Sequence, residues 1–386
     1  MIKGNFPLEQ LKSLPTPFYY YDVELLKQTL ATVKDESSRH GYQVHYAVKA
    51  NRNPRILSII AEAGFGADCV SGGEIQSALE AGIPAEKIVY AGVGKADWEI
   101  VLGLEKGIYC FNVESEAEIK VINEIAGSMG KVAPVALRIN PEIDAHTHSK
   151  ITTGMKENKF GINLGLLNDA LDLLQTTKHV HLSGIHFHIG SQITDISAFQ
   201  ALVIRANEIQ DELESRRIKL EHVNFGGGLG INYHHPNHVP VADFKTYFDA
   251  ISALVELRPG QQAHFEPGRS IIAQCGTLIS RVLYVKEGET KTFVILDAGF
   301  TDLIRPAMYD AYHRIENLTS EDEAAQTYDV VGPVCESADV FAQGIELNTT
   351  RRGDLIAIRS AGAYGEAMAS QYNGRRLPAA YFSDTL

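Results

Sequence analysis

The sequence predicts an α/β protein with a (β/α)8 TIM-like barrel and a second, mainly antiparallel β domain. Eight short apolar segments alternate with stretches of helical period between residues 44 and 266. Strands that alternate with helices in this way are joined by right-handed crossovers and form a parallel sheet. After Arg269, strand-like segments follow one another without amphipathic helices between them, which is typical of an antiparallel β domain.

The expected barrel strands are short, apolar and separated from one another by helical stretches. They are Val44–Lys49, Gly66–Val70, Ile88–Ala91, Tyr109–Val113, Pro134–Asn140, Ser183–Ile189, His222–Gly226 and Gln262–Glu266. Apolar residues recur at helical spacing in Asn53–Gly64, Gly73–Gly82, Glu116–Ile125, Leu167–Leu174, Ala198–Arg216 and Val241–Glu256. An open doubly wound sheet is the alternative, but no G-x-G-x-x-G turn follows the first strand, which weakens it.

The β domain is expected to be discontinuous in sequence. Its expected strands are Ile271–Val285, Lys291–Leu296, Asp329–Gly332 and Asp354–Ile358. The strand-like segment Pro17–Tyr21 (PFYYY) precedes the first helix and is expected to join them. We therefore expect the barrel to span 23–267 and the β domain to combine 1–22 with 268–386.

Composition excludes several classes of protein. The formal net charge is −13, which argues against binding to a nucleic-acid backbone. The 4 cysteines lie far apart and form no C-x-x-C pair, so we expect neither a disulfide framework nor a zinc site. The start has no apolar core of a signal peptide, and no run of 18 apolar residues occurs, so we expect no membrane partner. These features predict a cytoplasmic protein.

Residues able to carry chemistry fall at the carboxyl ends of the expected strands, where barrel active sites lie. They are Lys49, Asp68, Asn112, Arg138, His188, Gly226–Gly228 and Glu266. Desolvation lowers the pKa of an amine, which would suit Lys49 to Schiff-base chemistry; the alternative is a lysine that only reaches to solvent. The glycine run GGGLG follows the seventh strand, where barrels commonly bind phosphate, although a flexible loop is the alternative.

Two further motifs leave a choice of chemistry open. In EPGR, Glu266 could pair with a protonated pyridine nitrogen and Arg269 could grip a carboxylate or phosphate, or the two could simply close a loop. In GIHFHIG, His186 and His188 share one strand face and could suit a metal-dependent barrel hydrolase. Because the other strand ends offer few metal ligands, we predict no metal, and the flat His188 ring could equally stack on a cofactor.

An ordered series of motifs closely resembles the fold-type III pyridoxal-phosphate decarboxylases. The motifs are YAVKAN, GADCVSGGE, RINP with TGMKENKFGI, HFHIGSQ, GGGLG, EPGR, GPVCESAD and AGAYG. The resemblance runs from Pro17 nearly to the C-terminus. It implies an alanine-racemase-like fold, pyridoxal 5'-phosphate as cofactor, an amino-acid substrate and a homodimer with shared active sites.

The resemblance also implies roles for individual residues. Lys49 would hold the cofactor as a Schiff base, and Cys335 would be the proton donor. The expected cofactor-binding residues are Lys49, Asp68, His188, Ser191, Gly227, Gly228, Glu266, Gly268, Arg269 and Tyr364. The expected substrate-binding residues are Arg269, Arg305, Tyr309, Glu336 and Tyr364. Two of the residues with implied roles, Cys335 and Glu336, would come from the second subunit of the dimer.

The same residues bear on the substrate. Arg305 and Tyr309 beside Glu336 suit a distal group that carries both charges. The resemblance therefore implies decarboxylation of meso-2,6-diaminopimelate to L-lysine and CO2, the last step of bacterial lysine synthesis. Alternatives within the class act on ornithine, lysine, arginine or a carboxylated polyamine. A noncatalytic relative that regulates another protein is disfavoured because Lys49 and Cys335 are both present.

Overall fold

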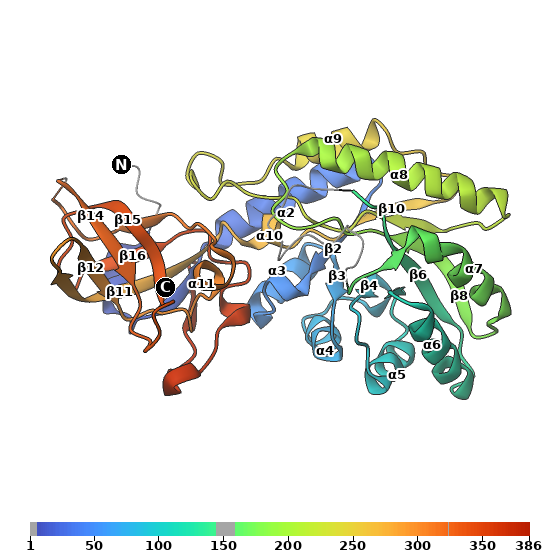
Figure 1. Cartoon of the computed structure of the whole chain (residues 1–386), viewed down its shortest axis with the longest axis horizontal. Coiled ribbons are helices and arrows are strands. Elements are labelled where there is room, and N and C mark those ends of the chain that lie inside the picture. Colours follow the sequence, from blue (N-terminus) through green and yellow to red (C-terminus); the bar gives the residue numbers. More distant parts are fainter. Residues whose placement is uncertain (1–5, 144–158, 323) are drawn as a thin grey trace. The chain divides into compact units, whose positions relative to one another are not determined.

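The computed structural model describes residues 6–143, 159–322 and 324–386. The chain divides into two compact units, which Figure 1 draws in the colours of the sequence. The barrel unit comprises Leu30–Gly230 and Asp243–Gly268, and the β unit comprises the described residues up to Thr29 together with Ile231–Ala242 and Arg269–Leu386. The domain limits expected above, 23–267 and 1–22 plus 268–386, stay a prediction.

Eight parallel strands of the described residues close the barrel. They are β2 (Gln43–Ala47), β3 (Gly66–Cys69), β4 (Ile88–Tyr90), β5 (Cys110–Val113), β6 (Ala133–Asn140), β8 (Val180–His186), β9 (His222–Asn224) and β10 (Gln262–Phe265). Their order is β5-β4-β3-β2-β10-β9-β8-β6, and pairing of β5 with β6 closes the ring; the short β7 (Ile162–Asn163) pairs in parallel with the end of β6. The predicted parallel barrel is confirmed, and each of its strands overlaps a segment expected from the sequence.

Helices surround these strands, as Figure 1 shows. They are α2 (Val23–Ser38), α3 (Pro54–Glu62), α4 (Gly72–Glu80), α5 (Asp97–Lys106), α6 (Glu116–Ser128), α7 (Leu167–Thr176), α8 (Ile196–Ser215) and α9 (Phe244–Ser252). Sequence periodicity did not predict α5, which carries a glycine in its interior. A Cβ on Gly103 would lie 2.7 Å from the Phe111 ring, so the glycine allows this helix to pack closely on β5.

Helix caps fix the connections at the carboxyl ends of β3 and β5. The side-chain oxygens of Ser71 and Ser115 accept hydrogen bonds from the backbone N–H groups of Glu74 and Glu118, three residues later. The carboxylate of Glu74 in turn accepts a hydrogen bond from the N–H of Val70. These Ser-x-x-Glu pairs satisfy N–H groups that a helix start leaves without partners, and so define where each strand turns into its helix.

The β unit contains a mainly antiparallel sheet, as predicted. Its strands are β1 (Phe18–Tyr21), β11 (Gly276–Glu287), β12 (Thr292–Leu296), β13 (Ile315–Asn317), β14 (Ala325–Val331), β15 (Val340–Asn348), β16 (Leu355–Ile358) and β17 (Ala379–Phe382). The main path runs β13-β16-β11-β12-β14-β15, and β1 pairs with β11 and β17. The PFYYY segment therefore joins this sheet, with Phe18 opposite Ile279. Short helices α1 (Leu8–Ser13), α10 (Arg269–Ile272) and α11 (Arg305–Tyr309) complete the unit.

Several details of the β unit differ from expectation. The strand expected from Ile271 begins only at Gly276, because the preceding residues form α10. Strands β13, β15 and β17 were not predicted; β15 contains Gly344 at a φ of 59°, which interrupts its apolar pattern. Residues 153–158 of the motif TGMKENKFGI lie outside the described residues. No helix in the described ranges is both long and apolar enough to span a bilayer.

Candidate active site

Lys49 lies at the carboxyl end of the barrel, in a single 3-10 turn, Val48–Ala50, that directly follows β2. Its Nζ donates a hydrogen bond to Oδ2 of Asp68 on β3 over 2.8 Å. The lysine side chain is 36% exposed, whereas that of Asp68 is fully buried. The amine therefore lies at an accessible edge, while the acid that orients it is enclosed.

The protonation of Asp68 is unusual. Burial raises its pKa to about 6, the charge of Glu266 adds to the rise, and Lys49 opposes it. Its second oxygen, Oδ1, is buried and has no partner among the described residues. Asp68 thus has one carboxylate oxygen, Oδ1, that accepts no hydrogen bond from the described residues, and a pKa close to neutral pH.

Glu266, just after β10, is a buried carboxylate with three side-chain hydrogen-bond partners. Its Oε1 accepts hydrogen bonds from Asn224 (2.7 Å) and Asn112 (3.2 Å), and its Oε2 lies 2.8 Å from Nε2 of His186. Burial alone would raise its pKa. The charge and hydrogen bond of His186 and the charge of Lys49 outweigh that cost and hold the pKa well below its usual range. Glu266 therefore stays ionised.

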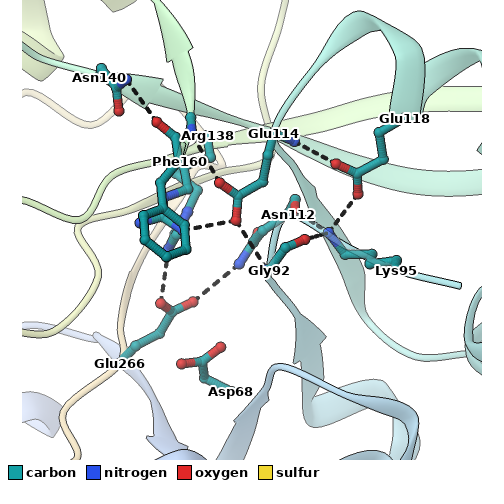
Figure 2. A network of polar contacts seen from close by, with 12 residues as sticks. Asp68, Gly92, Lys95, Asn112, Glu114, Glu118, Arg138, Asn140, Phe160 and Glu266 are labelled. Atoms are coloured by element: carbon teal, nitrogen blue, oxygen red, sulfur yellow. Dashed lines mark hydrogen bonds and ion pairs between the residues drawn. The ribbon is translucent and has the colours of Figure 1, made fainter. Parts of the chain in front are cut away.

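A second polar network braces the ends of β5 and β6 (Figure 2). The ammonium of Lys95 is fully buried and donates to the backbone oxygen of Asn112 and to the carboxylate of Glu118. Glu118 also accepts from the N–H of Glu114, and Glu114 accepts from Nη1 of Arg138 over 2.8 Å. The network fixes the strand that presents the Asn112 amide to Glu266.

The glycine run forms a cradle without side chains. A Cβ on Gly227 would lie 2.2 Å from the carbonyl oxygen of Glu266, and one on Gly228 would lie 2.8 Å from that of Gly190. Gly268 packs against the Lys49 turn, because its Cβ would meet that of Ala47 at 3.0 Å. The N–H groups of Gly227, Gly228 and Gly268 donate to no described residue. A loop whose backbone can approach a ligand closely, and whose N–H groups have no acceptor among the described residues, is suited to binding a phosphate group.

His188 and Ser191 lie in the loop after β8, beside this cradle. Nδ1 of His188 lies 3.2 Å from where a Cβ of Gly226 would be, and Gly190, next to Ser191, meets Gly228. Burial and the charges of Arg138 and Lys49 hold the pKa of His188 well below its usual value. A neutral, half-buried imidazole is suited to stacking on a planar ring.

The geometry gives the metal-dependent alternative no support. Nε2 of His186 is engaged with Glu266, and its buried Nδ1 has no partner among the described residues. In the described parts of the chain, no group of three or more His, Cys, Asp or Glu side chains is arranged to hold a metal ion.

In the β unit, the structure gathers two predicted arginines around a tyrosine that was not predicted. Nη1 of Arg269 and Nη1 of Arg305 both donate to the hydroxyl of Tyr233, over 2.7 and 3.1 Å. The Arg269 guanidinium lies 4.9 Å from the ring centroid of Tyr364. Tyr364 itself has a φ of 57°, in the left-handed region that is uncommon for a bulky residue. Tyr309 ends the helix α11 that Arg305 begins.

Cys335 and Glu336 lie elsewhere in the β unit, and both are exposed. The backbone N–H of Cys335 donates to Oδ1 of Asn373, and Oε1 of Glu336 accepts a 2.6 Å hydrogen bond from the hydroxyl of Tyr372. Within the described residues, the side-chain hydrogen bond of Glu336 thus runs to Tyr372 and not to the arginine cluster. These two predicted residues are held in place at the surface of the unit.

Sequence reasoning missed Lys95, Glu114, Tyr233 and Tyr372. The signal for Tyr233 was its place three residues after GGGLG, on a segment that belongs to the β unit although barrel residues flank it. Lys95 and Glu114 carry no pattern that separates them from surface charges, because their burial arises only when the barrel closes.

Known proteins resemble the chain over its whole length. The family model for the pyridoxal-binding domain of pyridoxal-dependent decarboxylases matches residues 24–273. A diaminopimelate decarboxylase of Bacteroides thetaiotaomicron is 60% identical over 386 residues, covering 100% of both chains. The crystal structure of diaminopimelate decarboxylase from Helicobacter pylori complexed with L-lysine is 41% identical, with a TM-score of 0.91 over 97% of this chain and 93% of that one.

A more distant likeness shows the fold alone. Lysine decarboxylase from Selenomonas ruminantium is 23% identical, with a TM-score of 0.87 over 100% of this chain and 97% of that one. The fold is therefore shared by proteins of both names and does not by itself separate the two activities. By its matched family model and its full-length relative, the chain belongs to the diaminopimelate decarboxylase family of pyridoxal-dependent decarboxylases.

Proposed function

We propose that the chain decarboxylates meso-2,6-diaminopimelate to L-lysine and CO2, as the last step of lysine synthesis. The observation that carries the proposal is the placement of the Lys49 amine, 2.8 Å from the buried Asp68 and at the same barrel edge as the ionised Glu266. The cofactor implied by the family is pyridoxal phosphate. The substrate of the enzyme would be a small amino acid, and we expect neither a nucleic acid nor a membrane as a partner.

The barrel residues fit this cofactor. Lys49 would hold it covalently through Nζ, beside Asp68, and the amides of Gly227, Gly228 and Gly268 with Ser191 would bind its phosphate. The flat ring of His188 would stack on it. When bound, the cofactor supplies an electron sink for the charge left at the substrate Cα as CO2 departs. Glu266, being ionised, would keep a proton on the ring nitrogen that faces it.

The residues of the β unit would select and orient the substrate. Arg269, Arg305 and Tyr309 would bind a carboxylate at the distal end, with Tyr364 nearby, and Glu336 would receive the distal ammonium group. Fixing both distal charges determines which of the two carboxylates leaves. The Cys335 thiol would then return a proton to Cα as general acid.

Cys335 and Glu336 belong to the finer part of the proposal, a cytoplasmic homodimer with shared sites. Both residues are exposed and anchored by hydrogen bonds, which suits side chains that complete the site of a second subunit. All four cysteines are free thiols, as in the reducing cytoplasm.

Two measurements on purified protein test the proposal. Release of CO2 is compared for meso-diaminopimelate, lysine, ornithine and arginine, and we expect turnover of the first alone. The absorbance of protein-bound cofactor is recorded for the wild type and for Lys49→Ala, and we expect the covalent band only in the wild type. Faster turnover of lysine, ornithine or arginine would favour the alternative activity, and a colourless wild type supplied with pyridoxal phosphate would remove the cofactor assignment.

A further inference from the structure

Tyr233 occupies the centre of the arginine cluster of the β unit. The side chain is 7% exposed, and its hydroxyl oxygen accepts hydrogen bonds from Arg269 and Arg305. The Arg305 guanidinium also lies over the Tyr233 ring, 5.1 Å from its centroid. One phenol therefore aligns two buried cations that would otherwise repel each other.

The hydrogen bonds of Arg305 use one side of its guanidinium. Nη1 carries two hydrogens, which go to the hydroxyl of Tyr233 and, over 2.8 Å, to Nε2 of His313. Both acceptors are uncharged, and no carboxylate of the described residues lies within ion-pair distance of Arg305. Nε and Nη2 have no partner among the described residues. That edge of the guanidinium matches the two oxygens of a carboxylate.

His313 is held in the one tautomer that can do this. Its Nδ1 lies 2.9 Å from the carbonyl oxygen of Arg359, so Nδ1 carries the proton and donates it. Nε2 is then a lone-pair acceptor for Arg305. Burial and the charge of Arg305 lower the pKa of His313 to about 3, which keeps the ring neutral.

The hydroxyl proton of Tyr233 is the remaining unmatched group. Its oxygen accepts two hydrogen bonds, and the O–H donates to no described residue. A buried donor without an acceptor is costly, so a ligand oxygen is expected to satisfy it. We infer that Tyr233 is a specificity-determining residue that donates its O–H to the distal carboxylate of the substrate, while Tyr233 and His313 together turn the Nε–Nη2 edge of Arg305 toward that same carboxylate.

This inference rests on the proposed function for its substrate and makes the arginine cluster a carboxylate-selective subsite. A substrate that ends in a simple amine would leave the Tyr233 proton and the Arg305 edge unsatisfied. Sites built around such hydrogen bonds reject ligands that lack the matching group much more strongly than apolar pockets do.

The test compares two ligands of the cofactor-loaded protein by calorimetry. L-lysine keeps the distal carboxylate, whereas 1,5-diaminopentane has the same length and both amines but no carboxylate. Tyr233→Phe removes the hydroxyl and keeps the ring under Arg305. We expect it to raise the Kd of L-lysine by about 10- to 100-fold and that of the diamine by less than about threefold. The KM of meso-diaminopimelate should rise by a similar factor with little change in kcat.

Tyr312→Phe is the matched control, because Tyr312 is a partly exposed tyrosine of the same unit that stacks on His234. It should change neither Kd. His313→Gln is a second variant and should weaken L-lysine binding in the same direction but less. A Tyr233→Phe protein that is folded, by its thermal midpoint, and keeps the wild-type ratio of the two Kd values would overturn the inference.

The outcomes separate this inference from the proposed function. In one outcome, the wild type releases no CO2 from meso-diaminopimelate and still binds L-lysine more tightly than the diamine, with Tyr233→Phe removing that preference. This result would contradict the proposed reaction and support the carboxylate subsite. Normal decarboxylation by the wild type, with an unchanged ratio of the two Kd values in Tyr233→Phe and His313→Gln, would support the proposed reaction and contradict the inference about Tyr233.

Discussion

At the scale of single residues, Glu266 shows how a buried charge is kept for chemistry. Two side-chain amides and one imidazole surround it, and together with Lys49 they more than offset the cost of burial. Its neighbours thus hold its pKa well below the usual range, which keeps it ionised near neutral pH. A carboxylate in this state can hold a proton on a nitrogen atom opposite it.

We predict that Glu266→Gln lowers kcat by about 100- to 1,000-fold, because a neutral amide cannot stabilise a protonated ring nitrogen. Lys49 remains, so the absorbance of the covalently bound cofactor should persist. Glu221→Gln is the control, since Glu221 forms an exposed pair with His181. A Glu266→Gln enzyme within threefold of the wild-type kcat would show that the charge is not needed.

At the scale of elements, the barrel was predictable and the site only in part. Parallel strands appear in the sequence as continuous apolar runs. Lys49, Asp68 and Glu266 stand directly at the ends of such runs, where barrel sites lie, and so could be identified from the sequence. Tyr233 was missed because a segment between β9 and α9 leaves the barrel unit, and local sequence does not encode where such a segment packs. The same holds for Lys95, whose burial depends on contacts with three separate segments.

The glycine loop between β9 and α9 yields a prediction of its own. A Cβ at Gly227 would lie 2.2 Å from the Glu266 carbonyl, so Gly227→Ala must displace the cradle. We expect the Kd of pyridoxal phosphate, measured by absorbance titration, to rise at least about tenfold. Gly165→Ala has open space around its Cβ and should bind the cofactor normally. Equal affinities for the two variants would mean that this loop does not hold the phosphate.

Three neighbouring strands carry a cluster of stacked imidazoles. Nε2 of His45 on β2 lies 3.0 Å from Nδ1 of His264 on β10, and the His264 ring lies 4.9 Å from that of His222 on β9. The rings are buried, and burial lowers the pKa of His222 to about 3, with the charge of His45 adding to the effect. An unfolded histidine titrates near 6.5. Between these values the unfolded chain binds more protons, so stability is lost as the pH falls.

For His222 alone we expect a loss of about 2 kcal/mol in the free energy of unfolding between pH 7.5 and pH 5. His222→Phe keeps an aromatic ring of similar size and should lose that much less over the same interval, as measured by urea titration. His181→Phe, at an exposed position, should lose as much free energy of unfolding over this pH interval as the wild type does. An unchanged pH dependence in His222→Phe would place the acid sensitivity elsewhere.

At the scale of the whole molecule, the residues of the proposed site divide between the two units. The lysine, the glycine cradle and Glu266 belong to the barrel unit, whereas Cys335 and Glu336 belong to the β unit, exposed and turned to the surface. A homodimer with shared sites would explain why the proposed proton donor, Cys335, is exposed, since an exposed thiol can be enclosed by a second copy of the chain.

This arrangement makes a prediction about mixtures of inactive variants. Lys49→Ala lacks the proposed cofactor attachment and Cys335→Ala lacks the proposed proton donor, so each homodimer should be nearly inactive. After subunit exchange, every mixed dimer would contain one site with both residues intact. Random exchange should therefore restore about a quarter of wild-type CO2 release. Mixing Lys49→Ala with Glu266→Gln is the matched control: both residues lie in the barrel unit of the same chain, so each of the two sites of a mixed dimer keeps one defect.

The two mixtures therefore distinguish shared from unshared sites. If Lys49 and Glu266 act within one subunit and Cys335 acts from the other, the second mixture yields mixed dimers whose two barrels are each defective in one residue, and activity stays low. The first mixture recovers because the intact barrel of the Cys335→Ala chain meets the intact thiol of the Lys49→Ala chain. Mass spectrometry of intact dimers verifies exchange. No recovery in the first mixture after verified exchange would mean that each chain uses its own Cys335.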